Sequence, residues 1–408
     1  MKRVRTATTA GPENGEVAGA NLGALRSHNT ALVLGLLRDA GTEGISRLEL
    51  AERTGLTPQA VSKITARLRA QGLAAEAGRR ASTGGKPRTV LRLVPEAGHA
   101  VGVHLDRDEL RVVLVDLDGA VVGERRGELD LGAGAEAVLG AVCAAVRGVV
   151  GGLRAGAGAE ADAGAGSGGT GAGAGGLAAV GSLVGVGVAL PGPLDHVRGV
   201  LHRVTGFPEW DGFPLRDALA ERLGVPVVVD KDTNAAALGL AVGGDEGAAG
   251  AAGRSFAYLH LGTGLGAGLV IGGSVHRGAR TGAGEFGHQV IRLDGPLCEC
   301  GNRGCVEVLC LRAVARGEVA EAARVLGVAA GNLAGLLDID VVLLGGRTVA
   351  GDPEAYVNGV GEVLRARARR EGTGPGPVPV RVAPRGERIV AEGAAQLLLA
   401  PLFGRGDA

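Results

Sequence analysis

The chain has 408 residues, 46% hydrophobic and 2% aromatic, so it can bury more than one core, built mainly from Val, Leu and Ala. The formal net charge is zero, but residues 1–98 carry fifteen Lys or Arg against eight Asp or Glu, a balance of +7 that leaves −7 for the remainder. Only the first part is therefore expected to meet a polyanion. Five cysteines, three of them in one cluster, argue against a disulfide framework and for a reducing cytoplasm. The start of the chain lacks a signal-peptide pattern, and glycine or charge interrupts the apolar runs, so no membrane partner is expected.

The N-terminal part has the pattern of a helical DNA-binding domain. Residues 1–22 are polar and aperiodic and are expected to be a disordered tail. Helical periodicity then runs to Gly41, and a capping box from Ser46 to Glu49 opens a second helix. After a glycine turn, Thr57 can cap a third helix whose early residues are small and polar. This order is the helix-turn-helix plan, which we place at residues 23–96.

A basic hairpin follows these helices. Residues 73–77 and 89–94 can pair as strands around a basic, glycine-bearing loop at 79–88, which suits phosphates or a minor groove. The alternative is a generic helical bundle with a solvated basic face, but the hairpin favours DNA binding. The expected DNA-binding residues are Ser46, Arg47, Thr57, Gln59, Ser62, Lys63, Arg67, Lys86 and Arg88.

From residue 97 the apolar period changes to two, which predicts antiparallel strands over 101–105 and 110–114. A helix is expected over 138–150, and the Gly/Ala-rich segment 151–176 is expected to be a surface loop because it has no means of packing. A buried strand then begins at Val184.

The stretch from Thr281 to Glu307 concentrates metal-binding chemistry. His288, Cys298, Cys300 and Cys305 offer one imidazole and three thiolates, a set that suits tetrahedral zinc. Gly301 and Gly304 would let the loop fold back so that the sulfurs converge. The alternative is three unpaired buried cysteines beside an ordinary surface histidine.

The same stretch resembles a family signature. Gly284-Glu-Phe-Gly-His288 followed by Cys298-Glu-Cys-Gly-Asn-Arg-Gly-Cys-Val-Glu307 is similar to the signature of the ROK family, which groups bacterial sugar kinases with transcriptional repressors derived from them. The N-terminal elements Ser46-Arg-Leu-Glu-Leu-Ala51, Thr54-Gly-Leu56 and Gly84-Gly-Lys-Pro87 resemble the winged helix-turn-helix of ROK repressors. The resemblance covers roughly residues 23–402.

The resemblance implies an α/β fold, an actin-like/hexokinase-type two-lobed sensor behind a winged helix-turn-helix. The first lobe would span residues 97–222 and the second residues 223–386, with a helix at 387–402 returning to the first lobe. Zinc would be structural in this family, holding the loop that lines the sugar site.

The resemblance also implies a sugar site made of Lys231, Asp232, Glu285, His288 and Glu307. Asp232 falls on the carboxylate that serves as the base in the kinases, and His288 would use one ring nitrogen for zinc and the other for sugar. Lys231 replaces a sugar-binding asparagine of the family, and a cation in the pocket suggests an acidic or phosphorylated sugar. In the alternative, Lys231 points outward and is solvated.

The phosphate-binding turn of the kinases, Asp-x-Gly-Gly-Thr, is replaced here by Asp106-Arg-Asp-Glu-Leu110. Side chains would block the approach of phosphates to the backbone, and the added carboxylates would repel a triphosphate. The helical segment after the cysteine loop is also shorter than in the kinases. We therefore expect no ATP binding and no enzymatic activity, and we expect Asp232 to accept a hydrogen bond from a bound sugar.

These features predict a cytoplasmic regulator, a repressor of carbohydrate uptake or catabolism genes that a sugar or sugar derivative releases from operator DNA. A homodimer or tetramer is expected, because a single DNA-binding module gives little specificity. Two alternatives stay open. One is an active ATP-dependent sugar kinase that carries a DNA-binding domain, and the other is a regulator whose sensor answers to a protein.

Overall fold

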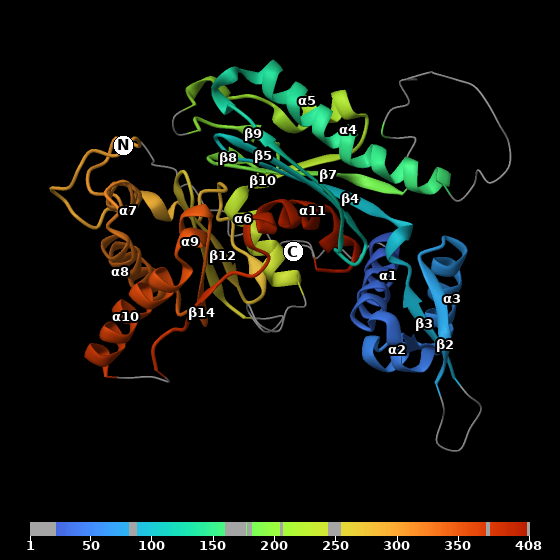
Figure 1. Ribbon diagram of the computed structural model, residues 1–408. Coiled ribbons are helices and arrows are strands. Elements are labelled where there is room, and N and C mark those ends of the chain that lie inside the picture. The colour runs from blue at the N-terminus through green and yellow to red at the C-terminus, as the bar shows by residue number, and fades with distance from the viewer. Residues whose placement is uncertain are drawn as a thin grey trace, which may run out of the picture.

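The computed structural model describes residues 22–80, 88–159, 177, 182–204, 207–243, 254–372 and 376–405. Two five-stranded sheets with flanking helices form the body, and a small helical domain with its own three-stranded sheet lies beside the first of them (Figure 1). The expected tail, except Leu22, and Lys86 of the basic loop lie outside the described residues.

The N-terminal domain is a winged helix-turn-helix. Ser46 caps the second helix through the expected capping box with Glu49, and Thr57 caps the third by accepting a hydrogen bond from the Ala60 amide at 3.2 Å. The wing is the β2–β3 hairpin, and β1 pairs with β3. Its elements are α1 (Leu22–Asp39), β1 (Ile45–Ser46), α2 (Arg47–Thr54), α3 (Pro58–Ala70), β2 (Ala74–Arg80) and β3 (Arg88–Leu93).

The first sheet has the strand order β10-β7-β4-β5-β6. β10, β7 and β4 run parallel, whereas β4, β5 and β6 form the expected antiparallel meander. Helices α4 and α5 cover one face (Figure 1). These elements are β4 (His99–Leu105), β5 (Glu109–Asp116), β6 (Val121–Glu128), α4 (Ala135–Ala159), β7 (Leu183–Leu190), α5 (Leu215–Leu223) and β10 (Val227–Lys231), with the short pair β8 (Leu194–Asp195) and β9 (Val200–Leu201).

Two expected boundaries are wrong in this lobe. Strand β10 hydrogen-bonds to β7 and so belongs to the first sheet, which moves the lobe boundary from residue 222 to beyond Lys231. Helix α4 continues to Ala159, into the segment expected to be a loop from residue 151. Alanines in this segment support a helix that its glycines only weaken.

The second sheet has the strand order β13-β12-β11-β14-β15. Helices α7, α8 and α10 pack against one face around a core that includes Tyr356 and Leu326 (Figure 1). The elements are α6 (Asp232–Val242), β11 (Phe256–Leu261), β12 (Leu265–Ile271), β13 (Ser274–Val275), α7 (Val306–Ala315), α8 (Val319–Leu337), β14 (Val341–Gly345), α9 (Arg347–Gly351), α10 (Pro353–Glu371), β15 (Val380–Val382) and α11 (Ile389–Leu402).

Helices α6 and α11 lie between the two sheets (Figure 1). Their approach depends on glycine: a Cβ on Gly102 of β4 would lie 1.8 Å from the Ala391 carbonyl oxygen, and one on Gly393 of α11 would lie 1.9 Å from that of Ala235 in α6. Backbone thus packs on backbone, so α11 is fixed against β4 and α6.

The C-terminal helix also completes the core of the DNA-binding domain. Leu399 and Phe403 belong to the same buried cluster as Val33 and Leu37 of α1 and Val113 of β5. A Cβ on Gly35 of α1 would lie 2.9 Å from the Phe403 carbonyl oxygen. The DNA-binding domain is therefore joined to the body by a shared apolar core rather than by a linker alone.

Two helices, within α4 and α8, are long and apolar enough to cross a membrane by length and composition: Ala135–Gly152 and Val319–Leu337. The prediction that no apolar run reaches spanning length is wrong, because a few glycines and one or two charges do not lower the mean hydropathy of these helices enough. Val142 and Val146 of α4 and Leu326 of α8 pack in the lobe cores. Core helices of soluble proteins have the same composition, so this evidence for a membrane is weak.

Candidate functional site

A polar cavity lies between the lobes, at the ends of β4 and β10 and beside the β11–β12 turn. All five residues predicted to bind sugar line it, namely Lys231, Asp232, Glu285, His288 and Glu307. Asp106, Arg107 and Thr263 line it as well. Carboxyl ends of parallel strands are where α/β proteins place ligands, which explains why these distant segments meet here.

Lys231 lies inside the protein, with 3% of its side chain exposed, so the alternative in which it is solvated is wrong. Its ammonium donates to Glu285 Oε1 at 3.1 Å and to the carbonyl oxygen of Ala283. The carboxylate of Glu285 therefore neutralises the cation locally. The presence of Lys231 alone gives no reason to expect an anionic ligand.

Asp230 lies directly before Lys231 and was not among the predicted site residues. Its Oδ1 accepts from the Lys231 amide at 2.7 Å and from Asn234 Nδ2 at 2.9 Å, and its Oδ2 accepts from Arg277 Nε at 2.7 Å. The carboxylate is 1% exposed. This buried network fixes the backbone that presents Lys231 and Asp232 to the cavity.

Asp232 begins α6, and its Oδ1 accepts from the Thr233 amide at 2.6 Å. Burial raises the pKa of Asp232 to about 7, and the charges of Asp106 and Glu285 act in the same direction. A carboxyl group with a pKa near neutrality can accept either a proton or a hydrogen bond from a hydroxyl at physiological pH.

Glu307 and two closely packed glycines shape the same wall of the cavity. Glu307 Oε2 accepts from the Leu265 amide at 2.8 Å, so its orientation is set by the β11–β12 turn. A Cβ on Gly284 would lie 2.0 Å from the Ala267 carbonyl oxygen, and one on Gly287 would lie 2.1 Å from that of Leu265. Glycine at both positions lets the segment carrying Glu285 pack directly on β12.

The predicted metal ligands converge. One donor atom from each of His288, Cys298, Cys300 and Cys305 lies within 4.8 Å of the others. Cys300 Sγ and Cys305 Sγ are 3.7 Å apart, as are Cys298 Sγ and His288 Nδ1. Tetrahedral zinc with Zn–S bonds of ~2.3 Å separates sulfurs by ~3.8 Å, so the cluster fits a metal such as zinc.

The loop geometry agrees with this fit. Gly301 and Gly304 both adopt left-handed backbone, with φ of 91° and 64°, as the folded-back loop requires. His288 directs Nδ1 to the cysteines and also lines the polar cavity between the lobes, which leaves Nε2 for a ligand.

The β4–β5 turn contacts the second lobe at two points. Asp106 Oδ1 accepts from Thr263 Oγ1 at 2.9 Å, and both oxygens of Asp108 accept from Arg347 Nη2 at 2.9 Å. Asp108 and Glu109 were the carboxylates expected to repel a triphosphate, and Asp106 was the aspartate that matches the kinase turn. Sequence reasoning missed Thr263 and Arg347 because their partners lie more than 150 residues away.

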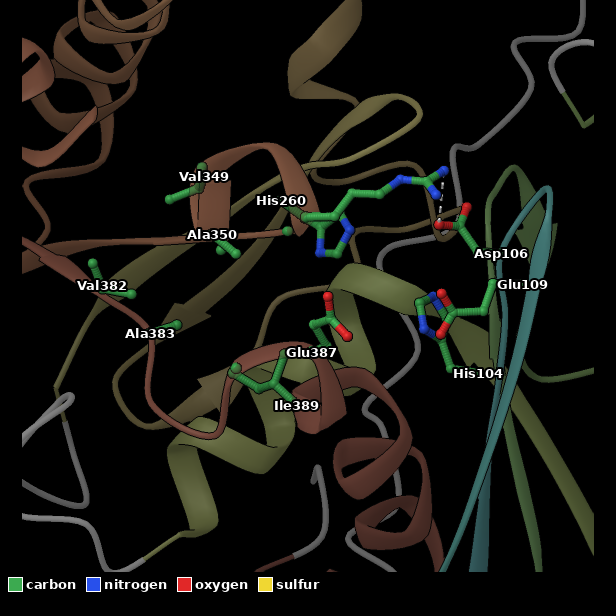
Figure 2. A pocket seen from close by; sticks show the side chains of 14 residues that line it. His104, Asp106, Glu109, His260, Val349, Ala350, Val382, Ala383, Glu387 and Ile389 are labelled. Atoms are coloured by element: carbon green, nitrogen blue, oxygen red, sulfur yellow. Dashed lines mark ion pairs between the residues drawn. The ribbon is translucent and has the colours of Figure 1, made fainter. Parts of the chain in front are cut away.

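A second cavity adjoins this turn (Figure 2). Val349, Ala350, Val382 and Ala383 line one side, and His104, Asp106 and Glu109 line the other. Burial lowers the pKa of His104 to about 4, and burial also lowers that of His260. Both imidazoles are therefore neutral at physiological pH. Three carboxylates, of Asp106, Glu109 and Glu387, line the cavity with the guanidinium of Arg347, which is already paired with Asp108, and this excess of negative charge disfavours a nucleotide.

The predicted DNA-binding residues divide by exposure. Arg47, Thr57, Gln59, Ser62, Lys63, Arg67 and Arg88 are exposed. Ser46 is 3% exposed, and its hydroxyl accepts from the Glu49 amide at 3.3 Å, so capping α2 removes it from the surface available to DNA. Arg67 also donates to Thr30 of α1. Lys86 lies outside the described part of the chain.

Comparisons with known proteins agree with this architecture. Residues 176–316 match the ROK family, and residues 30–74 match a winged helix-turn-helix DNA-binding domain. The chain is 28% identical to the xylose repressor of Caldicellulosiruptor bescii over 283 residues, which is 69% of this chain and 63% of that protein. It therefore spans less than two thirds of that relative. It is 41% identical to the glucokinase of Thermotoga maritima over 125 residues, 30% of this chain and 38% of the glucokinase.

The fold extends over almost the whole chain in a solved structure. A ROK family transcriptional regulator described as a homologue of the Escherichia coli MLC protein superposes with a TM-score of 0.69 at 19% identity, covering 93% of this chain and 98% of that one. The chain therefore carries a ROK family domain preceded by a winged helix-turn-helix domain, on an actin-like two-lobed α/β fold.

Proposed function

We propose that the protein is a sugar-responsive DNA-binding transcriptional regulator, a repressor of carbohydrate uptake or catabolism genes that a sugar releases from operator DNA. One observation carries the proposal: α11 packs on β4, which leads into the cavity at Asp106, and its end shares a buried core with Val33 and Leu37 of α1. A ligand that closes the lobes can thereby change the placement of the DNA-binding helices.

The effector we propose is a neutral sugar. Hydroxyl groups of a sugar can donate to Asp232, Glu285 and Glu307, and His288 Nε2 offers a further contact. Lys231 is already paired with Glu285, so an acidic or phosphorylated sugar would gain little from it. Because the relative from Caldicellulosiruptor bescii is a xylose repressor, xylose is the first candidate to try.

The zinc we propose is structural. Bound to His288 and the three cysteines, it would hold the segment from Glu285 to Glu307 against β12 and so present these carboxylates to the sugar. We further propose a cytoplasmic homodimer or tetramer, because operator half-sites are read by paired recognition helices. Arg47, Gln59, Ser62 and Lys63 on α2 and α3 are the proposed DNA contacts.

An active sugar kinase is the second candidate. The raised pKa of Asp232, about 7, favours it, because a general base works best near the pH at which it acts. One contact argues against the kinase: Arg347 donates hydrogen bonds to Asp108 across the space where a triphosphate would lie. We therefore propose that the protein transfers no phosphate.

The experiment uses the full-length protein and genomic fragments that it retains. A panel of neutral sugars is added, and release of DNA is measured beside release of ADP from ATP. We expect one sugar to release DNA from the wild type but not from Glu285→Gln, with no ADP formed. Sugar-dependent ADP release would overturn the assignment in favour of the kinase, and DNA binding insensitive to every sugar would leave a sensor that answers to another partner.

A further inference from the structure

A separate cavity of about 380 Å³ lies where the DNA-binding domain meets the body. Its size falls within the range of ~300–1,000 Å³ typical of small-molecule sites. Its walls come from the end of α1, the β5–β6 turn, the end of α6, α11 and Arg405. It shares no lining residue with the polar cavity between the lobes.

Three arginines line the cavity, and one of them, Arg385, pairs with Glu392 at 3.1 Å. Arg405 pairs with Asp39 at 2.7 Å, whereas Arg38 has no ion pair with a carboxylate within the described residues. The Arg38 guanidinium donates to the Val242 carbonyl oxygen at 3.4 Å and lies 4.3 Å from the centre of the Phe403 ring. Burial and the charge of Arg405 lower the pKa of Arg38 to about 10. A half-buried cation of this kind is stabilised by an anion.

The same cavity also offers hydrogen-bond acceptors. Gln396 of α11 is 4% exposed, and its Oε1 has no hydrogen-bond partner among the described residues. Asp118 of the β5–β6 turn lines the same cavity, and burial together with the charge of Asp116 raises its pKa. A buried acceptor without a donor is costly, and a ligand hydroxyl would satisfy it.

We propose that this junction cavity binds a small phosphate monoester that carries hydroxyl groups. The phosphate would lie on Arg38 and Arg405, and a hydroxyl would donate to Gln396 Oε1. Guanidinium groups match phosphate oxygens bidentately. Asp39 is already engaged by Arg405, so its charge is offset where the phosphate would lie.

The location gives such a ligand a regulatory role. Arg38 belongs to α1 of the DNA-binding domain, whereas Gln396 and Arg405 belong to the C-terminal part that packs on the body. A ligand bridging them stabilises one placement of the two parts. Binding of the phosphate ester is therefore linked to DNA affinity, independently of the neutral sugar between the lobes.

The test is calorimetric titration of the full-length protein with inorganic phosphate and with glucose 6-phosphate, at constant ionic strength. We expect saturable binding of both, with the ester tighter. Arg38→Met should weaken both by at least about tenfold, because a charge-assisted hydrogen bond is lost. Gln396→Met should weaken only the ester, because inorganic phosphate does not need the hydroxyl acceptor.

Three comparisons keep the result interpretable. Arg370→Met, on the exposed end of α10, should change neither affinity. Glu285→Gln should abolish the response to a neutral sugar but leave ester binding intact, which separates this proposal from the proposed function. Arg405→Met replaces Arg38→Met if the latter does not fold.

Equal binding of sulfate and phosphate that Arg38→Met and Arg405→Met leave unchanged would mean an adventitious ion only, and the proposal would fall. Loss of ester binding in Glu285→Gln would place the ester between the lobes and would equally overturn it.

Discussion

Arg347 of the second lobe donates from one guanidinium nitrogen to both carboxylate oxygens of Asp108 in the first lobe, at 2.9 Å each. The β4–β5 turn thus holds a cation from the second lobe. Together with the hydrogen bond from Thr263 to Asp106, this ion pair links the lobes without a nucleotide.

Breaking this link should weaken sugar binding modestly. The two side chains are 40% and 57% exposed, so the pair contributes less than about 1 kcal/mol, and Asp108→Asn or Arg347→Gln should lower sugar affinity a few-fold at low salt. Calorimetry at two salt concentrations measures the effect. Arg324→Gln, which breaks an exposed Arg–Glu pair within α8, is the matched control. If the loss of binding free energy in the double variant equalled the sum of the losses in the two single variants, the two side chains would not cooperate.

Asp232 should make stability depend on pH around neutrality. Its pKa of about 7 in the folded protein exceeds the ~3.9 of an unfolded aspartate, so between these values the folded state binds more protons. Stability is therefore full below pH ~4, falls as the pH rises toward 7, and levels off above the folded pKa of about 7. Asp232→Asn should flatten the decline in urea midpoint between pH 5.5 and 8. Identical slopes in the two proteins would contradict the raised pKa.

Metal removal should separate sensing from DNA binding. The cluster of His288 and three cysteines holds the segment that carries Glu285 and Glu307, whereas the core of the winged helix-turn-helix is shared with α11 and β5 and contains no residue of that segment. We expect a chelator, or Cys300→Ser, to abolish the sugar response while DNA retention persists. Zinc content and both binding activities are measured in the same samples. Simultaneous loss of both activities would mean that the metal supports the whole fold.

The recognition helix should show two kinds of DNA contact. Lys63→Ala is expected to weaken binding to all sequences and to reduce the salt dependence by about 0.9 per lost phosphate contact. Gln59→Ala should instead relax sequence preference. Fluorescence anisotropy over a salt series distinguishes them, with Arg370→Ala as a remote control of equal charge.

Ser46→Ala should cost about 1 kcal/mol of stability through its lost cap and leave the salt dependence of DNA binding unchanged.

Glycine at the contact with α11 should be indispensable. A Cβ on Gly102 would lie 1.8 Å from the Ala391 carbonyl oxygen, so Gly102→Ala should destabilise the protein by about 1–3 kcal/mol or more. Gly140, exposed on α4, has nothing within 4 Å of such a Cβ, and Gly140→Ala should stabilise by about 0.5–1 kcal/mol. Denaturant unfolding compares the two. Equal effects would show that α11 can shift away from β4 at little cost.

The sequence was most informative where spacing within one segment determines chemistry. The capping box at Ser46 and the convergence of three cysteines on His288 were predictable, because their partners lie a few residues apart and the geometry is local. The placement of Asp232, Glu285 and Glu307 around one cavity needed the family resemblance as well.

Contacts between distant segments were not predictable in the same way. Nothing in the sequence around Arg347 indicates that its partner is Asp108, and nothing near Lys231 reveals that Glu285 neutralises it. The assignment of β10 to the first sheet likewise depends on pairing with β7, which local periodicity cannot encode. These relationships follow from the packed fold.

The junction between α11 and α1 has a consequence during synthesis. A ribosome releases the DNA-binding domain first, but Leu399 and Phe403, which cover Val33 and Leu37, emerge more than 350 residues later. Until then, part of the apolar surface of α1 stays uncovered in the nascent chain, because the C-terminal residues that pack on it have not yet been synthesised. The C-terminal part of this shared core is therefore available only after translation has passed through the whole second lobe.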